Sequence, residues 1–229
     1  MVQQEVPEPV REGCDDYWTW NKKHKANEVR LHGNRGETAH FHPNWSNGTA
    51  AVRGTRCLNY GRHYWEVKVS QRIFGTSMMF GVGTKRARLH VDAFVNLLGE
   101  DGESWGLSHK GLIWHNAKCK DYCKPFKENE STVIGILFDW NKGTLSYYKD
   151  GEDMGVAFAG LNRCQDSLYP IVCSTAAKTE MTLGKRRRSF LNLQDRCRAT
   201  IISKLRQENE IDSLPLPNRI RTFVKEILH

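Results

Sequence analysis

The sequence predicts a mainly β protein, an antiparallel β-sandwich followed by a small helical region at the C-terminus. Polar and apolar residues alternate along Tyr64–Val69, the period-2 pattern of a half-buried strand. β-prone runs recur about every ten residues between Tyr17 and Leu183, with turn signals such as Asn141-Lys-Gly143 and Asp150-Gly151 between them. Helical periodicity is confined to about the last forty residues, which favours an antiparallel sandwich over a parallel α/β sheet.

The strands differ in their expected depth. Along Tyr64–Val69 the alternation directs Trp65 toward one face and Tyr64 toward the other. Met78–Val82 and Val133–Phe138 are almost wholly apolar, which predicts more deeply buried strands. Aromatic side chains on such strands usually fill the space between two sheets. We therefore expect three aromatic residues in the core: Trp65, Trp105 and Tyr169.

The C-terminal region carries two short apolar stripes with helical spacing. The first has apolar residues at steps of four: Leu193, Cys197, Ile201 and Leu205. The second follows Pro217 with the spacing i, i+3, i+4, i+7 and i+8: Ile220, Phe223, Val224, Ile227 and Leu228. Two helices this short cannot build a core alone, so their apolar faces must be covered by the β domain or by a partner protein.

Composition narrows the class of protein. The chain has 229 residues, 39% of them hydrophobic, and no apolar run approaches the ~20 residues of a membrane span. Its first residues lack the basic start and apolar stretch of a signal peptide. We therefore expect an intracellular protein, in the cytoplasm and/or nucleus, without a membrane partner. In that setting the seven cysteines are expected to be reduced thiols.

The formal net charge of +8 is partly concentrated in Lys185-Arg-Arg-Arg188. We interpret this run as a solvated linker, with a nuclear-import signal or a phosphate contact as the alternative. No zinc finger, RNP-type aromatic motif or basic helix accompanies it, so nucleic acid is not expected as a main partner. The predicted organisation is a flexible N-terminal segment at 1–16, a β domain at 17–184, a basic linker at 185–190 and the helical region at 191–229.

Two sequence patterns could indicate catalysis or metal binding. Gly102-Glu-Ser104-Trp-Gly106 fits a nucleophile elbow, but that motif requires a strand-to-helix turn in a parallel sheet, which the sequence does not predict. A zinc site could draw on four residues: His109, His115, Cys119 and Cys123. The segment that carries them is polar and lacks a CxxC pair, so it indicates a surface loop. We expect no catalytic residue, no cofactor and no metal.

The C-terminal residues resemble a known motif. Leu193-x3-Cys197-x3-Ile201 followed by Leu214-Pro-Leu-Pro217 is similar to the SOCS box, and the resemblance covers Leu191 to His229. In that family the first helix docks on elongin C, which implies a contact role for Leu193, Cys197 and Ile201. The Leu-Pro-x-Pro element contacts cullin-5, which implies four further contact residues: Leu214, Pro215, Leu216 and Pro217. The alternative is a core-packing helical hairpin that binds no partner.

The β region also resembles a known domain. Its landmarks, in order, are Gly61-x-x-Tyr-Trp-Glu-Val67, Gly81-Val-Gly83, Ser104-Trp-Gly106, Gly143-Thr-Leu-Ser-Tyr147 and Leu168-Tyr-Pro170. They are similar to the SPRY (B30.2-like) domain, a bent antiparallel β-sandwich used for protein recognition, over roughly Ala26 to Gly184. A SPRY domain followed by a SOCS box is similar to the SPRY domain-containing SOCS box proteins. Three segments are most similar to the third member of that family: 48–54, 97–101 and 172–177.

The resemblance implies a site for a short Asn-containing target peptide in loops at one rim of the sandwich. Matched by motif, the implied contact residues are Pro43 and Asn44 in the first loop, Phe94, Leu97, Gly99 and Glu100 in the second, and Thr175, Ala176 and Ala177 in the third. Better-known members have an Arg-Pro pair in the first loop, Tyr at the position of Phe94, Ser at that of Glu100 and Val-Trp-Gly at 175–177. We therefore expect the same site with a different recognition sequence.

Together these resemblances imply the substrate-recognition subunit of an E3 ubiquitin ligase. The expected partners are elongin B and elongin C, cullin-5 with its RING partner, and target proteins that are ubiquitinated and degraded by the proteasome. Such a receptor needs no catalytic residue of its own, because it raises the local concentration of target lysines near the ubiquitin donor. One alternative is a SPRY adaptor without ligase recruitment, and another is a basic protein associated with nucleic acid.

Overall fold

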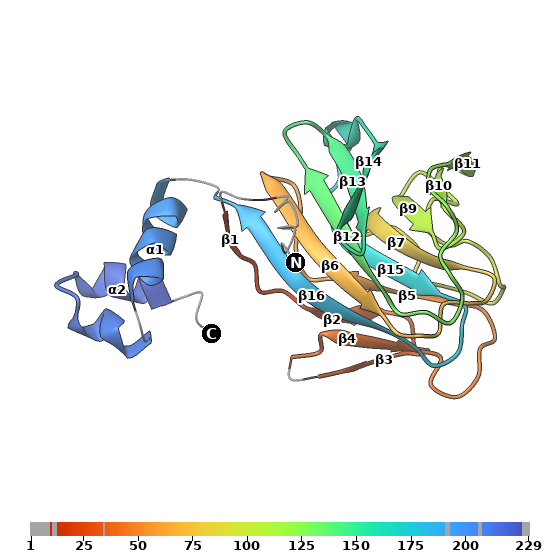
Figure 1. The fold of residues 1–229 in the computed structure, drawn as a ribbon, viewed down its shortest axis with the longest axis horizontal. Helices are drawn as coiled ribbons and strands as arrows, with labels where there is room; N and C mark the ends of the chain where they lie inside the picture. The colour runs from red at the N-terminus through yellow and green to blue at the C-terminus, as the bar shows by residue number, and fades with distance from the viewer. Residues whose placement is uncertain (1–9, 11–12, 34, 191–192, 206–207, 226–229) are drawn as a thin grey trace, which may run out of the picture.

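The computed structural model describes the chain except residues 1–9, 11–12, 34, 191–192, 206–207 and 226–229. Two antiparallel eight-stranded sheets pack face to face, and a small helical region lies to one side of them (Figure 1). The predicted β-sandwich with short C-terminal helices is confirmed.

The first sheet has the order β14-β13-β12-β6-β16-β4-β3, with β1 paired to β16. Its strands are β1 (Gly13–Asp15), β3 (Val29–His32), β4 (Thr38–Phe41), β6 (Arg62–Val69), β12 (Thr132–Asp139), β13 (Thr144–Lys149), β14 (Glu152–Phe158) and β16 (Thr179–Ser189). The second sheet has the order β11-β10-β9-β7-β15-β5-β2, with β8 paired to β5. Its strands are β2 (Trp20–Lys25), β5 (Thr49–Gly54), β7 (Met78–Gly83), β8 (His90–Val91), β9 (Ser104–Ser108), β10 (Leu112–His115), β11 (Lys118–Asp121) and β15 (Tyr169–Ser174).

The core lies between the sheets, where the apolar faces of the strands meet. Its largest fully buried side chains are Trp20, Phe41, Trp65, Phe80, Phe138 and Tyr147. The apolar runs predicted to be deeply buried form β7 and most of β12. Both predicted turns are present, with Gly143, Asp150 and Gly151 at positive φ. At Gly81 a Cβ would lie 1.9 Å from the Trp105 carbonyl oxygen, so β7 and β9 can pair closely only because this residue has no side chain.

Three aromatic predictions have different outcomes. Trp65 is buried in the core as predicted. Trp105 is only half-buried, and its ring stacks on His115 with centroids 4.3 Å apart. Tyr169 is also half-buried, with the Lys85 Nζ 5.8 Å from its ring centroid. Tyr64 departs in the opposite direction: it was expected on the polar face, but it is buried in a small outer cluster with Val10, Leu137 and Tyr148.

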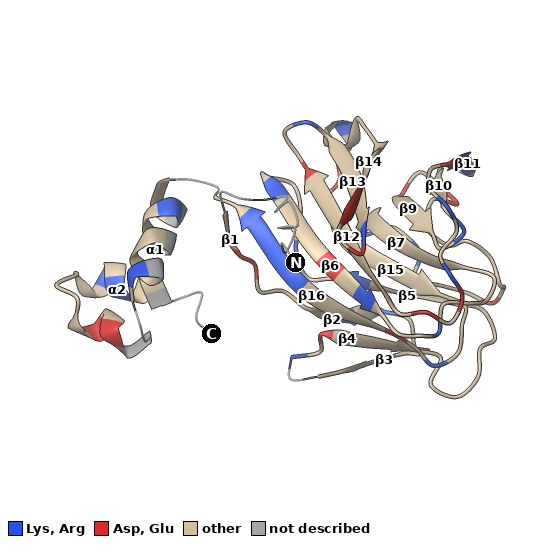
Figure 2. Ribbon diagram, viewed as in Figure 1, with Lys and Arg blue, Asp and Glu red and all other residues tan. Residues whose placement is uncertain are grey.

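The basic run is not a linker, as the sequence suggested, but the final part of strand β16. Arg186, Arg187 and Arg188 pair with β6 on one side, and the last two also pair with β1 on the other. The Arg186 guanidinium donates to the Trp18 carbonyl and lies 2.9 Å from Glu37. Figure 2 shows the blue stretch of β16 beside the acidic residues at β1. These acidic groups and carbonyls compensate the positive charges, so the basic residues are part of the β domain and not of a linker.

This pairing moves the predicted domain boundaries. Residues 13–15, assigned to a flexible segment, form β1, and the remainder of the predicted segment 1–16 falls largely outside the described residues. The Asp16 carboxylate is buried and lies 3.8 Å from the Nε atom of Arg188. The sandwich therefore extends from Gly13 to Ser189 rather than from 17 to 184.

The C-terminal region contains α1 (Leu193–Lys204), the 3-10 helix η2 (Glu208–Ser213) and α2 (Asn218–Lys225). A short 3-10 turn, η1 (Leu161–Arg163), lies within the sandwich. None of the helices in the described part of the chain has the length and apolar character needed to cross a membrane. None of the seven cysteines, all of which the structure describes, forms a disulfide.

Candidate functional site

The first candidate surface is a groove between the two C-terminal helices. Its volume is about 320 Å³, and it is lined by Leu193, Gln194, Cys197, Arg198, Ile201, Ile220, Phe223 and Val224. The structure thus brings the two predicted apolar stripes together along one groove. Leu193 stands at its edge with 74% of its surface exposed. Leu205 lies just beyond the end of α1, and the predicted stripe residues Ile227 and Leu228 fall outside the described residues.

A miniature core holds this helical pair. Ile211 of η2 and Val224 of α2 are fully buried. Arg198 of α1 is only 7% exposed; its Nη1 atom donates to the Phe223 carbonyl oxygen at 3.1 Å, and its guanidinium lies 4.1 Å from the centroid of the Phe223 ring. This combination of a hydrogen bond and a cation–π contact fixes α1 against α2. The stripe pattern missed Arg198, because the residue beside Cys197 was counted with the polar face.

The Leu214-Pro-Leu-Pro217 segment forms an ordered turn into α2. The Leu216 N–H donates to the Leu214 carbonyl at 2.7 Å, and the Pro217 carbonyl accepts from the N–H groups of Ile220 and Arg221. Pro215 and Pro217 are exposed, whereas Leu214 and Leu216 are half-buried. The Arg221 side chain braces the turn by donating to the Leu216 and Asp212 carbonyls at 2.9 and 3.3 Å. The four residues are presented on one accessible turn.

The second candidate surface is the rim formed by the loops that were expected to bind a peptide. Strand β8 pairs with Thr49 and Ala50, which follow the first loop. The Thr49 Oγ1 atom lies 2.8 Å from the carbonyl oxygens of Ala93 and Val95, so the first and second loops are joined. The His42 Nε2 atom lies 3.1 Å from the Ser174 carbonyl oxygen, which joins the first loop to the third. The structure therefore places all three predicted loops side by side.

The predicted contact residues divide into two groups by burial. Five are accessible, fully or in part: Pro43, Asn44, Phe94, Glu100 and Ala177. Four are buried: Leu97, Gly99, Thr175 and Ala176. The first group could touch a ligand. The second supports the loops from below.

The buried group has identifiable packing roles. Leu97 belongs to a small apolar cluster with Met79, Ile171 and Cys173. The Thr175 hydroxyl lies 3.0 Å from the Ser77 carbonyl oxygen and accepts from the Ser77 N–H at the same distance. Gly99 has φ +78°, and a Cβ there would lie 2.2 Å from the Trp114 carbonyl oxygen. The structure gives these buried residues a supporting role, and their assignment as direct peptide contacts stays a prediction.

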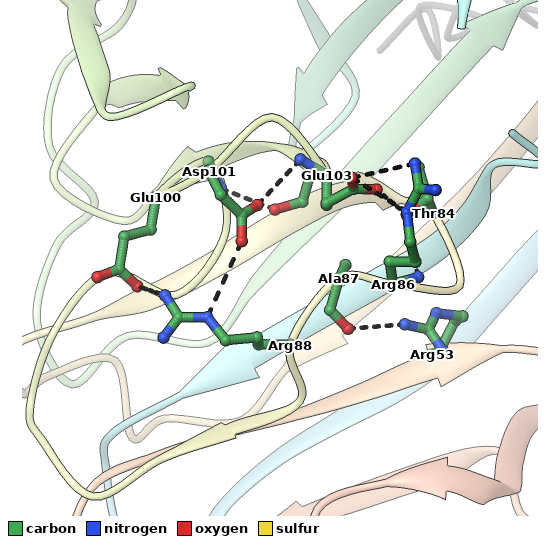
Figure 3. A network of polar contacts seen from close by, with 10 residues as sticks. Arg53, Thr84, Arg86, Ala87, Arg88, Glu100, Asp101 and Glu103 are labelled. Carbon is green, nitrogen blue, oxygen red and sulfur yellow. Dashed lines mark hydrogen bonds and ion pairs between the residues drawn. The ribbon is translucent and has the colours of Figure 1, made fainter. Parts of the chain in front are cut away.

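Glu100 is accessible but already paired. Figure 3 shows the Glu100 carboxylate against the Arg88 guanidinium, with Asp101 on the other side of the same arginine at 3.9 Å. In the same view the Arg53 guanidinium donates to the Ala87 carbonyl oxygen at 2.9 Å. These contacts tie the two ends of the 89–100 loop together, which positions Phe94 at its far end.

Two parts of the rim were missed by sequence reasoning. Trp45, in the first loop, exposes 82% of its surface, close in sequence to Asn44. Phe94, in the joined second loop, exposes 49%, so the rim carries two accessible aromatic side chains. The 70–77 loop also borders this surface, since the Arg72 carbonyl accepts from Thr179 and Gly75 lies against Thr175. A tryptophan within a short polar loop was the sequence signal from which the exposure of Trp45 could have been predicted.

The two chemical alternatives find no support in the geometry. Ser104 is buried at the start of β9, where its Oγ accepts from the Gly99 N–H at 2.9 Å, and no strand-to-helix turn follows it. The predicted zinc segment is a β-hairpin rather than the expected loop, with Trp114 opposite Cys119. His109 is buried elsewhere, with its Nδ1 atom 3.2 Å from the Met78 amide nitrogen.

Comparison with known proteins finds matches for both the sandwich and the helical region. The SPRY domain model matches residues 62–186, and the SOCS box model matches residues 189–225. SPRY domain-containing SOCS box protein 1 of Homo sapiens is 30% identical over 224 residues, covering 90% of this chain and 79% of the relative. This chain belongs to the SPRY domain-containing SOCS box protein family.

Within the family, the predicted similarity to the third member is confirmed. SPRY domain-containing SOCS box protein 3 of Xenopus tropicalis is 36% identical over 208 residues, covering 89% of this chain and 56% of the relative. This chain thus spans little more than half the length of that protein. Two solved structures share the fold. The TRIM65 PSpry domain has a TM-score of 0.59 at 20% identity, and the match covers 74% of this chain and 90% of that one. The SPRY domain of human HERC1 has a TM-score of 0.58 at 17% identity, and the match covers 72% of this chain and 97% of that one.

Proposed function

We propose that this family member is a non-catalytic substrate receptor of an elongin B/C–cullin-5 ubiquitin ligase. The observation that supports it most is the presence of two separate accessible surfaces on one chain. One is the apolar groove of the helical pair, with Leu193 exposed at its edge. The other is the loop rim with Trp45 and Phe94. A receptor must hold a target and a ligase at the same time.

The helical groove is the ligase end of the molecule. An exposed leucine at the edge of an apolar groove is the arrangement used when one helix docks its apolar side on a partner. Leu193 enters elongin C, and Cys197 and Ile201 extend the same contact. Cys197 acts here as a small apolar side chain. The Leu214-Pro-Leu-Pro217 turn, already ordered in the free chain, meets cullin-5 at a low entropic cost.

The rim is the target end. Exposed aromatic side chains on a rigid support are typical anchors for a binding partner. Trp45 and Phe94 supply apolar contact area, and the nearby Asn44 supplies an amide that can donate and accept hydrogen bonds. A short Asn-containing segment of the target binds here. Because the third loop has alanines where relatives have a tryptophan, its recognition sequence differs from theirs.

The chain then acts by proximity. Holding a target at the rim and a ligase at the helices raises the concentration of target lysines near the charged ubiquitin-conjugating enzyme. The target is ubiquitinated and degraded by the proteasome, in the cytoplasm and/or nucleus. The alternative, an adaptor without ligase recruitment, uses the same rim but predicts no complex with elongin B/C.

The test reconstitutes the complex from purified proteins. The full chain is mixed with elongin B/C and then with cullin-5 and its RING partner, and its mass is measured by size-exclusion chromatography with light scattering. A stoichiometric complex is expected, with Leu193→Ala/Cys197→Ala losing elongin B/C and Pro215→Ala/Pro217→Ala losing only the cullin. Trp45→Ala is the matched control at the rim and should assemble normally. Failure of the unaltered chain to bind elongin B/C would overturn the ligase role and leave the adaptor.

A further inference from the structure

An unassigned cluster of metal-binding side chains lies at the edge of the first sheet. The edge strand β3 pairs with β4, and β4 pairs with β16, so three strands lie side by side there (Figure 1). His40 of β4 stands directly opposite Glu180 of β16. Arg30 of β3 stands opposite His40, and His32 lies two positions further along β3, so His32 and His40 are on the same face of the sheet. Sheet pairing therefore gathers two imidazoles and one carboxylate from residues up to 148 positions apart.

The distances between the donor atoms suit a small metal ion. The Glu180 Oε1 atom lies 3.2 Å from His32 Nε2 and 3.9 Å from His40 Nδ1. One ligand atom from each of the three residues lies within 4.8 Å of the other two. Zinc–ligand bonds of roughly 2.0–2.2 Å in a tetrahedron place neighbouring donor atoms about 3.4 Å apart. The two distances from Glu180 lie within about 0.5 Å of that spacing, so rotation of the three side chains can complete the geometry.

The chemistry of the donors selects the class of metal. Imidazole nitrogens favour zinc and its neighbours among the transition metals, whereas magnesium and calcium prefer a shell of oxygen atoms. We propose that His32, His40 and Glu180 bind a divalent transition metal of the zinc class, with a fourth coordination position open to solvent. The three side chains are 26–50% exposed, so an ion can reach them without opening the fold.

A metal here would join the edge of the sheet to its interior. Strand β3 is held on one side only, and a shared ion would link it and β4 to β16 by coordination bonds. The site also borders the target rim, because His40 lies two residues before His42 and Glu180 two residues after Lys178. Metal binding should therefore raise the melting temperature of the sandwich and rigidify the base of the first and third loops.

The test measures metal binding by the full chain after removal of any polyhistidine tag. Isothermal titration calorimetry is run with zinc chloride and, for comparison, with magnesium chloride. Zinc should bind at one site involving these residues and magnesium should not. His32→Asn, His40→Asn and Glu180→Gln should each weaken zinc binding at least tenfold. The matched control is His24→Asn on β2, which lies outside the cluster and should bind like the unaltered chain.

A second measurement separates this site from the exposed thiols and does not depend on variants that fold. Exposed Cys57, Cys119 and Cys197 can also take up zinc. Nitrogen-15 NMR of the unaltered chain reads the imidazole nitrogens directly, and zinc should shift the His32 Nε2 and His40 Nδ1 signals together. If neither imidazole responds to zinc, or if the three cluster variants bind it as tightly as the unaltered chain, the proposal is wrong.

Discussion

Leu193→Ala should separate binding from folding in the helical region. Leu193 exposes 74% of its surface in the free chain, so its loss should change the free energy of unfolding by less than about 0.5 kcal/mol. On docking, the same side chain would be buried. Burial of a leucine side chain is worth about 1.5–3 kcal/mol, and truncation to alanine should remove about 2 kcal/mol of that. At about 1.4 kcal/mol per tenfold change, elongin B/C should bind roughly thirtyfold more weakly.

Ile211→Ala is the matched comparison. Ile211 is fully buried in the miniature core, where an isoleucine-to-alanine change typically costs about 2–5 kcal/mol. A pair of helices this small should lose its structure at that cost. Both variants should therefore bind elongin B/C poorly, but only Ile211→Ala should lose protection from hydrogen exchange across α1 and α2.

The assay combines biolayer interferometry on immobilised elongin B/C with hydrogen exchange of the free chain. Full-strength binding by Leu193→Ala would refute the assignment of the groove as the docking surface. Loss of hydrogen-exchange protection in Leu193→Ala would also refute the reasoning, because an exposed side chain should not hold the helices together.

Three further outcomes follow from the sandwich. Gly99→Ala should lower the free energy of unfolding, measured in urea, by at least about 2 kcal/mol, because alanine disfavours φ +78° and its Cβ would meet Trp114. Gly102→Ala is the control and should leave the free energy of unfolding unchanged, because a Cβ there meets nothing within 4 Å. A chain ending after Gly184 should melt roughly 5 °C or more below one ending at 190, because it lacks the pairing of the last part of β16 with β6 and β1. Equal melting temperatures would support the linker interpretation instead. Burial holds the pKa of His42 and His109 below the ordinary 6.5, so near that pH the unfolded chain binds more protons than the folded chain. The free energy of unfolding should therefore fall as the pH drops through 6.5. His42→Asn should reduce this fall between urea titrations at pH 7.5 and 5.5, and an unchanged fall would contradict the role of His42.

The local parts of the fold were predictable because their signals are local. Alternation within Tyr64–Val69 and the apolar runs of β7 and β12 depend only on neighbouring residues, and so do the turns at Gly143 and Asp150. The helical stripes are equally local, and α1 and α2 lie where their spacing placed them. The structure of these segments follows from short windows of sequence.

The basic strand was not predictable in the same way. Four consecutive cations look solvated in isolation, and the groups that compensate them lie far away in sequence. The Gly13 carbonyl that accepts from Arg187 is 174 positions distant, and the Trp18 carbonyl that accepts from Arg186 is 168 positions distant. The same reason hid the His32, His40 and Glu180 cluster. Charge patterns along a chain do not reveal partners that only the sheet topology brings together.

The rim shows a third kind of limit. Motif similarity pointed to three loops that the structure brings together, but it could not say which side chains face outward. Thr175 and Leu97 point toward the neighbouring strands and loops, where a hydrogen bond and apolar contacts hold the loops in place. Trp45, which no motif marked, points to solvent. A motif transfers the position of a loop more reliably than the direction of a side chain.

The rim contains inward-facing residues that hold the loops and outward-facing residues that contact solvent, so its surface can change while the fold persists. His42, Thr49 and Thr175 fix the loops to one another and to the strands through buried hydrogen bonds. The outward side chains of Trp45 and Phe94 contribute little to holding the loops together, so their replacement should cost little stability. Because the buried contacts keep the backbone in place, a new set of outward side chains meets a ligand in a defined geometry. If the rim binds a target as proposed, specificity can change through the exposed positions, whereas Thr175 should tolerate little substitution whatever the target.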